Sequence, residues 1–585
     1  MRTRDLVASF IALAATAVIH AAVASPAAPA GGRYIVQAAN VTAAYRDLAQ
    51  VGAKSERSLA IINAVSTHLN PRQLARLRKT VGVRVFEDRS LVTEQSVLSL
   101  LSPVTSPVVT AVSSLTTPTD GTGELAPSLL YQTNYPMLVG ANTLQQSGIT
   151  GRGVTVAVLD SGLWQDPLQN YGARVLATID VLNGGSGPVQ GDPYGHGTHV
   201  TSIAAGGAMN LSGSYLSIAP QANLVIVRAF NGTGGGRYVD VIAGLNWIVA
   251  NQKKYKIRVV NLSFGATPES YYWDDPLAQA VMKAWQAGIV VVAAAGNEGP
   301  GAMTIDVPGN VPYVITTGAL TDNYTPYNLT DDRLASFSST GPTYEGFVKP
   351  EMVAPGGHIV ASMSGSSYLA NIDPDSMLLT ENLFTMSGTS MAAAVTTGVV
   401  ALMLQSDPAL TPDEVKCRLL ASSRPAVTTG GKLAYSVFQQ GAGLINAVSA
   451  VNSSATGCAN IGLNVGADLA GTEHFGGPAN VNSSGSYYIM NMAGSTWGTA
   501  QNADGYTWSQ GYAWDQGYSW SEGYLWSQGY SWSQAYTWNN SYTWAKSYTW
   551  AKGYTWAKSV PWWTSSGSSA VATTPAAIEN WVPNQ

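Results

Sequence analysis

Four short segments of this chain carry the side chains that acyl transfer requires. The segment "VTVAVLDSG" is typical of a buried strand and ends at Asp160, and "GDPYGHGTHV" places His196 at the start of a glycine-flanked helix. The segment "TMSGTSMAAAV" places Ser390 directly before a long apolar helix. A serine hydroxyl becomes a nucleophile when a base takes its proton, and a buried carboxylate orients that base. Asp, His and Ser in this chain order therefore predict nucleophilic catalysis at an acyl group.

The fourth segment adds a donor for the negative charge that such a reaction develops. In "VVVAAAGNEGPG" an apolar strand ends just before Asn297. A carboxamide at this place is suited to donate a hydrogen bond to the oxyanion of a tetrahedral intermediate, beside the backbone N–H of Ser390. One such donor is worth roughly 3–4 kcal/mol of the activation barrier.

Each of these residues also has a commoner role when it is taken alone. Asp160 fits a turn or a helix cap, Ser390 fits a helix N-cap, and Asn297 fits a turn. His196 and His199 have the spacing of a metal-binding pair, but the chain has only six His and no third ligand clusters nearby. We therefore predict no metal site, interpret His199 as structural, and take the other four residues as one catalytic site.

The region from residue 131 to 452 alternates apolar, β-branched runs with helical patterns. Runs such as "NLVIVRAF", "RVVNLSF" and "GIVVVAAAG" predict an α/β fold, in which helices cover both faces of a doubly wound, mostly parallel sheet. Catalytic groups in such sheets gather at the carboxyl ends of the strands. Residues 33–89 instead combine two strand-like runs with a short amphipathic helix, which predicts a small α+β unit.

These motifs resemble those of the subtilisin-like serine peptidases over roughly residues 131–451. The resemblance implies Ser390 as nucleophile, His196 as general base and acid, Asp160 as orienting carboxylate and Asn297 as oxyanion donor. It also implies a three-layer fold and an inhibitory propeptide at residues 33–89. The chain departs from the family at Ala394, where a proline is usual. The segment "GGAMNLSGSYLS" lacks the Asn-rich calcium-binding pattern of some members, so a structural Ca²⁺ is unsupported, and catalysis should need no cofactor.

The resemblance also indicates where a peptide would bind. Its backbone should pair with "NLSFG" and lie near "FNGTGGG", and such β-strand addition tolerates many sequences. The pocket for the residue before the cut would be lined by Ser263, Phe264 and Gly265 on one wall and by Ala294, Ala295 and Gly296 on the other. Asp306 falls at its base, where a carboxylate would favour Lys or Arg. The alternative is that Asp306 caps a turn or points to solvent.

The ends of the chain and its composition limit the protein class. Residues 1–24 have Arg2 and Arg4, a small-residue apolar run and an Ala-x-Ala site, which predicts a cleavable secretory signal and a secreted or cell-surface protein. Charged residues are only 11% of the chain and the net charge is −5, so we expect no nucleic-acid partner. Cys417 and Cys458 are the only cysteines; a disulfide and two buried thiols both remain open, and we favour the disulfide.

Residues 90–130 are rich in Ser, Thr, Val and Pro and predict an exposed linker. No Lys or Arg occurs between Arg89 and Arg152. A strictly basic-selective enzyme would therefore have to release its propeptide near Arg89. An N-terminus between residues 100 and 130 would instead indicate a broader specificity or a helper protease.

A Gly/Asn/Ser-rich connector (453–504) leads to a Tyr-x-Trp motif that recurs nine times at a spacing of six within residues 505–563, before a tail (564–585). In a strand every aromatic side chain would share one face, so the period favours short β elements over helix. The repeat could bind glycan or cell-wall polymer, dock on the catalytic domain, self-associate, or only bury its own aromatics.

Two functions from different classes follow. The first is a secreted, self-inhibited serine endopeptidase that acts on proteins or peptides. The alternative is a surface-binding protein with an inactive peptidase-like scaffold.

Overall fold

A computed structural model describes residues 31–93, 135–182, 187–189, 191–210, 212–322, 332–378, 382–427, 433–477, 479–481 and 487–489, together with three two-residue strands in the repeat. The predicted signal segment (1–24), the tail (564–585), most of the repeat and residues 94–130 of the predicted linker lie outside the described residues. Predictions that fall on these segments stay predictions.

Residues 32–87 form a small α+β unit with a core of its own. Its antiparallel sheet has the order β2-β3-β1-β4, and one face is closed by two helices whose apolar side chains meet Val36 and Val65. Asn40 caps the first helix by accepting a hydrogen bond from the Ala43 amide at 2.8 Å. The elements are β1 (Gly32–Gln37), α1 (Val41–Gln50), β2 (Ser55–Leu59), β3 (Ala64–Leu69), α2 (Pro71–Leu77) and β4 (Arg84–Glu87).

The larger domain is built on an eight-stranded sheet. Its strand order is β14-β13-β12-β10-β6-β8-β7, with β15 also paired to β13. The pairs are parallel except β13 with β14. The strands are β6 (Thr155–Asp160), β7 (Val175–Asp180), β8 (Asn223–Arg228), β10 (Ile257–Leu262), β12 (Val290–Ala294), β13 (Ile315–Thr321), β14 (Arg333–Leu334) and β15 (Met352–Gly357). Their central members are buried along their length because helices cover the sheet.

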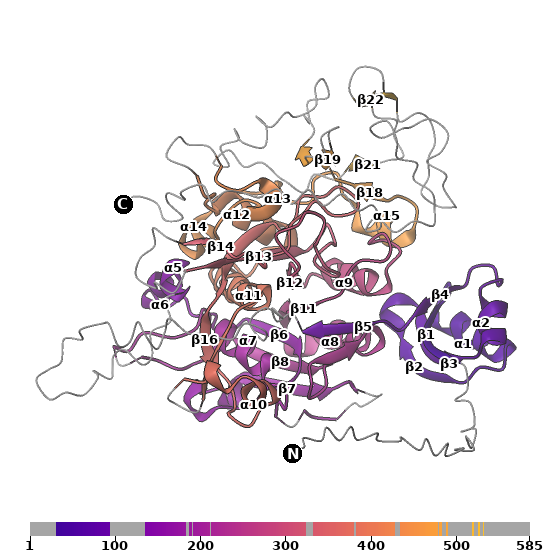
Figure 1. Ribbon diagram of the computed structural model, residues 1–585, viewed down its shortest axis with the longest axis horizontal. Coiled ribbons are helices and arrows are strands. Elements are labelled where there is room, and N and C mark those ends of the chain that lie inside the picture. Colours follow the sequence, from indigo (N-terminus) through magenta and orange to yellow (C-terminus); the bar gives the residue numbers. More distant parts are fainter. Residues whose placement is uncertain are drawn as a thin grey trace, which may run out of the picture.

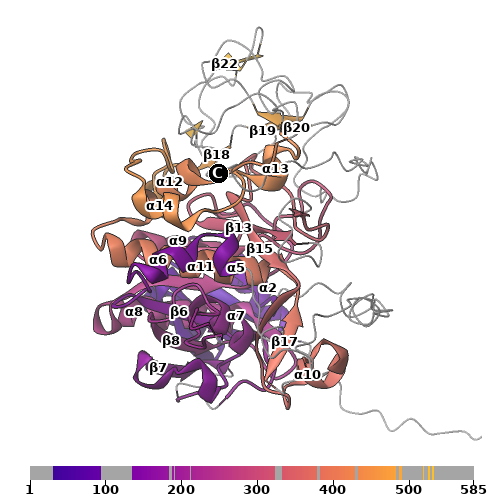
Figure 2. The same ribbon diagram turned by 90° about the vertical axis from the view of Figure 1, so that its left-hand side faces the viewer.

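Helices form the layers on either side of this sheet (Figure 1). Helices α8 and α9 contact each other and the strands β10 and β12, whereas α7, α11 and α14 form a second group. Figure 2 shows α12 and α14 at the opposite end of the domain from α10. The helices are α5 (Tyr135–Leu138), α6 (Ala141–Gln146), α7 (His196–Ala205), α8 (Tyr238–Tyr255), α9 (Pro276–Gln286), α10 (Tyr368–Ile372), α11 (Thr389–Ser406), α12 (Pro412–Ser422), α13 (Val437–Gln440) and α14 (Ala447–Asn452).

Helix α11 is the central element of this packing. It contacts β6, β10, β12, β13 and β15 as well as α7 and α14, and its residues from Thr389 to Leu404 are buried. By length and composition it could cross a membrane, but 89% of that window lies inside the protein. Each fully buried Leu, Val or Met contributes about 1.5–3 kcal/mol, so α11 is a core helix whose position the sheet fixes.

The linker predicted from residue 90 is wrong for its first four residues. Strand β5 (Ser90–Thr93) lies between β9 (Gly235–Arg237) and β11 (Phe264–Gly265) of the larger domain and pairs antiparallel with both. Figure 1 shows β5 running from the small unit into the larger domain. Leu91 is buried, while Ser90 and Val92 face outward. A composition rich in Ser, Thr and Val is compatible with a strand once a partner edge is available.

The boundary predicted at residue 452 is too early. The described structure continues through α15 (Val465–Ala470) and β18 (Phe475–Gly476), which lie against the larger domain. A disulfide joins Cys417 in α12 to Cys458, with the Cα atoms 5.1 Å apart. In the repeat, β21 (Tyr518–Ser519) pairs with β18, and β22 (Leu525–Trp526) pairs with β23 (Tyr530–Ser531).

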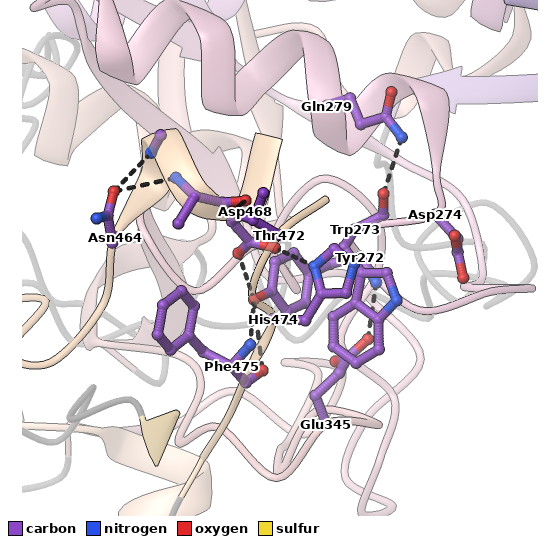
Figure 3. A network of polar contacts seen from close by, with 12 residues as sticks. Tyr272, Trp273, Asp274, Gln279, Glu345, Asn464, Asp468, Thr472, His474 and Phe475 are labelled. Carbon is purple, nitrogen blue, oxygen red and sulfur yellow. Dashed lines mark hydrogen bonds and ion pairs between the residues drawn. The ribbon is translucent and has the colours of Figure 1, made fainter. Parts of the chain in front are cut away.

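A buried carboxylate holds this C-terminal segment in place (Figure 3). Asp468 accepts hydrogen bonds from the hydroxyls of Tyr272 at 2.6 Å and Tyr313 at 3.0 Å. The ring of His474 contacts the same carboxylate through Nδ1 at 2.6 Å and stacks on Trp273 with ring centroids 4.7 Å apart. The segment therefore braces the loop that precedes α9.

We expect Asp468→Asn to lower the free energy of unfolding by about 1–3 kcal/mol, because an amide nitrogen cannot accept a hydrogen bond from the hydroxyl of a buried tyrosine. The measurement is chemical denaturation in a Ser390→Ala background, which excludes self-digestion. Asp375→Asn, at an exposed position, is the matched control and should stay within about 0.5 kcal/mol of the parent. Equal stabilities of the two variants would contradict the proposed brace.

Candidate active site

Asp160 and His196 form a buried pair at the carboxyl edge of the sheet. Asp160 is the last residue of β6, and His196 is the first residue of α7. The Nδ1 atom of His196 lies 2.8 Å from Oδ1 and 3.0 Å from Oδ2 of Asp160, and both side chains are at most 1% exposed. An Nδ1–H that donates to the carboxylate leaves Nε2 as the basic atom. Among the described residues, Nε2 has no hydrogen-bond partner.

The turn before α7 fixes the position of the imidazole. Asp192 accepts hydrogen bonds from the Gly195 amide at 2.9 Å and from the Thr198 amide at 2.8 Å. Gly195 adopts φ 106°, where a side chain would be strained. A Cβ atom at Gly197 would lie 2.4 Å from the carbonyl oxygen of Gly162. The glycines beside His196 are therefore required by backbone geometry and close packing.

Ser390 lies at the N-terminus of α11 and is tied to the end of β10. Its Oγ donates to the carbonyl oxygen of Ser263 at 3.2 Å, and the Ser263 hydroxyl donates to the carbonyl oxygen of Ser390 at 3.0 Å. Asn261 in β10 donates to Ser263 Oγ at 2.8 Å and accepts from Thr397 of α11 at 2.9 Å. These bonds fix the register between the helix and the sheet. The helix continues through Ala394 without interruption.

Asn297 follows β12, and its side-chain amide uses its oxygen in hydrogen bonds while its nitrogen has none within the described part of the chain. Its Oδ1 accepts from the amide of Thr389 at 3.0 Å and from the Thr389 hydroxyl at 3.1 Å. Its Nδ2 is buried and has no partner among the described residues. An oriented, unused N–H beside the first turn of α11 is suited to stabilise an oxyanion.

His199 lies one turn further along α7 and makes a different contact. Its Nε2 contacts the carbonyl oxygen of Phe384 at 3.0 Å, and burial lowers the pKa of its imidazole to about 3. The ring is therefore neutral at working pH and packs as part of the core. The two histidines do not share a ligand, and the described part of the chain contains no group of three or more His, Cys, Asp or Glu suited to a metal ion.

The predicted substrate-binding residues lie on the strand ends around Ser390. Phe264 and Gly265 form β11, directly after Ser263. Ala294 ends β12, and Ala295 and Gly296 follow it. Asp306 donates its backbone N–H to the carbonyl oxygen of Ala295 at 3.0 Å.

The Asp306 side chain is only 8% exposed, so the interpretation that it points to solvent is wrong. A Cβ atom at Gly296 would lie 3.0 Å from its Oδ2, which places the carboxyl against the predicted pocket wall. Burial, together with the nearby charge of Glu298, raises the pKa of Asp306 to about 7. The group is therefore neutral in acid and anionic above neutrality.

The groove between β9 and β11 is filled by β5. Thr93 pairs with Phe264, and Val92 pairs with Gly265 on one side and Gly235 on the other. Arg89 directly precedes the predicted linker in the sequence. In the structure its side chain contacts Tyr238 and Glu269. Sequence reasoning missed this strand, because the sequence Ser-Leu-Val-Thr does not alternate polar and apolar residues and matches the linker that follows it.

The profile of the Subtilase family matches residues 151–443, half of the chain. The chain belongs to the subtilase family. Serine protease AprX of Bacillus subtilis (strain 168) is 42% identical to this subtilase over 273 residues, which cover 46% of the subtilase and 60% of AprX. Subtilisin DY of Bacillus licheniformis is 31% identical over 315 residues, which cover 54% of the subtilase and 96% of that relative.

A solved structure agrees with the fold of the subtilase. Fervidolysin from Fervidobacterium pennivorans, described as a keratinolytic enzyme related to subtilisin, superposes with a TM-score of 0.53 at 21% identity. The match covers 73% of the subtilase and 61% of fervidolysin. The family makes the matched region a serine endopeptidase domain, whose substrates are proteins or peptides.

We expect Asn297→Ala in this subtilase to lower kcat by about 10²–10³ and to leave KM within about twofold, because its Nδ2 would bond only the transition state. Thr389→Val removes one of the two donors that orient the Asn297 amide, and it should give a smaller loss. Steady-state kinetics on a chromogenic peptide measure both. A raised KM at unchanged kcat would contradict the assignment of Asn297 as oxyanion donor.

Proposed function

We propose that the protein is a secreted serine endopeptidase made as a self-inhibited precursor. The observation that carries the proposal is the position of β5, which completes a three-stranded sheet between β9 and β11. Extended segments commonly bind by adding a strand to such an edge. Residues 31–93 would therefore block the groove through their own C-terminal strand, while the predicted secretory signal at residues 1–24 would direct export.

The register of β5 indicates which bond meets the nucleophile. Because Thr93 pairs with Phe264, an extended residue 94 would be opposite Ser263, whose carbonyl oxygen lies 3.2 Å from Ser390 Oγ. We propose that the first cut is at the bond between Glu94 and Gln95. This differs from a cut near Arg89, which strict selectivity for basic residues would require.

The geometry supports the following steps for this chain. Ser390 Oγ attacks the carbonyl carbon while Nε2 of His196 takes its proton, and Asp160 stabilises the imidazolium through Nδ1–H. Asn297 Nδ2 and the Ser390 amide would bind the oxyanion. Collapse breaks the C–N bond and the imidazolium gives its proton to the leaving amine. A water molecule, activated by the same imidazole, then hydrolyses the acyl-enzyme. Side chains, one backbone amide and water supply every group in these steps, so we propose that no cofactor takes part.

We expect Ser390→Ala to reduce casein hydrolysis by roughly a million-fold and to leave the secreted precursor at its full mass apart from the signal peptide. Intact mass and N-terminal sequencing of the secreted protein measure processing; wild type should begin at Gln95 or beyond it. Ser364→Ala, outside the site, is the control and should match wild type. If wild type neither digests casein nor processes itself, the inactive-scaffold alternative is favoured instead.

We further propose that Asp306 favours Lys or Arg before the cut. Its carboxyl lies at the pocket wall near Gly296, and a bound cation would favour its charged form. Glu94 would be a poor residue for the same pocket, because like charges repel. The precursor would therefore hold a slowly cut sequence in its own site, which favours inhibition over cleavage.

The preference for Arg over Phe before the cut should rise about tenfold as the pH passes through the pKa of Asp306. That pKa is about 7 with Arg89 in place, and loss of the Arg89 charge with the N-terminal unit should raise it, so the rise should fall at or above pH 7. The ratio of kcat/KM for matched Arg and Phe peptides removes pH effects common to both. Asp306→Asn should give a ratio that is low and independent of pH. Equal ratios for wild type and variant at every pH would refute the role of Asp306.

A further inference from the structure

Arg89, the residue before β5, is enclosed by side chains and backbone of the larger domain. Its Nη1 donates to the Tyr238 hydroxyl at 3.1 Å, and its Nη2 donates to the carbonyl oxygen of Thr267 at 2.6 Å. Glu269 Oε1 lies 3.1 Å from Nη2, and Asp275 Oδ2 lies 3.8 Å from Nη1. The guanidinium carbon also lies over the Tyr238 ring, 5.2 Å from its centroid. The Arg89 side chain is 18% exposed.

This cradle is organised by the larger domain itself. The Tyr238 hydroxyl donates to Asp275 Oδ2 at 3.0 Å. Asp275 Oδ1 caps α9 by accepting from the amides of Leu277 at 2.8 Å and Ala278 at 3.0 Å. Two of the groups that contact Arg89 are thus oriented by bonds that do not involve the N-terminal unit. Burial raises the pKa of Asp275, and the charge of Arg89 opposes this shift, so a bound cation favours the carboxylate.

The loop that carries Glu269 and Asp275 is held by hydrogen bonds to Glu345, Asp468 and Gln279. The Tyr272 amide donates to Glu345 Oε1 at 2.8 Å, and the Tyr272 hydroxyl donates to Asp468. Gln279 of α9 donates to the carbonyl oxygen of Trp273 at 2.8 Å. Figure 3 shows these bonds around Tyr272 and Trp273. Tyr272, Trp273 and Asp275 of this loop are therefore held by contacts that do not involve Arg89.

The backbone beside the cradle continues the strand pairing of the groove. The Tyr238 amide donates to the carbonyl oxygen of Arg89 at 3.0 Å, and the next pair is Ser90 with Arg237. A peptide that binds in the register of β5 would therefore bring its own side chain to the same place. With the cut after residue 94, that side chain belongs to the sixth residue before the cut.

We propose that Tyr238, Thr267, Glu269 and Asp275 form a subsite that binds an arginine at the sixth residue before the cut in extended peptide substrates. This proposal rests on the proposed endopeptidase function. Arg89 fills the subsite in the precursor, and departure of the N-terminal unit opens it to substrates. A planar guanidinium that stacks on an aromatic ring while donating in several directions favours arginine over lysine.

The test uses the mature enzyme and matched peptides that differ only at the sixth residue before the cut, with Arg, Lys or Gln there. A shorter peptide whose N-terminus is the fourth residue before the cut does not reach the subsite, and so it measures catalysis alone. We expect kcat/KM for Arg to exceed that for Gln about tenfold, which is about 1.4 kcal/mol, with Lys between them. The difference should lie mainly in KM and should shrink at high ionic strength.

Variants separate the subsite from general effects on folding. Glu269→Gln should lower the preference for Arg over Gln about threefold, and Asp275→Asn should remove most of it. Both should cut the short peptide as wild type does. Asp274→Asn is the matched control: Asp274 pairs with Arg84 at 2.6 Å and not with Arg89, so the preference should be unchanged.

Two different results would overturn the proposal: one concerns the subsite alone, and the other concerns the endopeptidase function on which it rests. Equal kcat/KM for Arg and Gln peptides, with the short peptide still cut, would mean that Arg89 only docks the N-terminal unit. Failure of wild type to cut either the long or the short peptide would overturn the endopeptidase function, and the subsite with it.

Discussion

The burial of α11 is the constraint on which the site depends. This helix packs on five strands and two helices and can present its N-terminus at only one place on the carboxyl edge of the sheet. Ser390 is fixed there, and the bonds through Ser263 and Asn261 set its register against β10. Parallel pairing of β10 with β6 and β12 then brings Asp160 and Asn297 to the same edge. Because parallel strands end together, Asp160 and Asn297 lie on the same sheet edge, Asp160 pairs there with His196, and Asn297 bonds Thr389 beside Ser390.

The groove follows from the same edge. Strand β11 continues from β10 and β9 precedes α8, so their free hydrogen-bonding groups face each other across a gap of one strand. The N-terminal unit supplies that strand as β5. Antiparallel backbone pairing depends little on which side chains the strand carries. Leu91, which is buried, and Arg89, which is enclosed by polar groups, instead make contacts specific to their side chains. Backbone pairing therefore holds the segment, and particular side chains fix its position along the groove.

Local signals in the sequence predicted the α/β fold, and they singled out residues that the structure places at strand ends and helix starts. Asp160, His196, Asn297 and Ser390 stand at the ends of strongly apolar elements, where periodicity and glycine mark the boundaries. Strand β5 could not be predicted in this way, because its partners lie about 140 and 170 residues later and its composition is that of a linker. The segment around Asp468 was missed for a similar reason. Nothing local in this Gly- and Asn-rich stretch indicates that the Asp468 carboxylate accepts hydrogen bonds from Tyr272 and Tyr313.

The contacts of the N-terminal unit determine what a first cut could achieve. Arg57 bonds Asp240 at 3.0 Å with both side chains largely buried, and Gln37 bonds Gln279 at 2.7 Å. The Arg84–Asp274 pair is about half exposed and contributes little. On the side of the N-terminal unit, the residues that make these contacts are Arg57, Gln37 and Arg84, and they and β5 all precede residue 94. Hydrolysis after Glu94 would therefore break the covalent connection without breaking a single docking contact. It would remove only the high effective concentration that the connection provides. In the proposed precursor the unit would therefore stay bound after the cut until it dissociates or is degraded, and cleavage and activation would be separate steps.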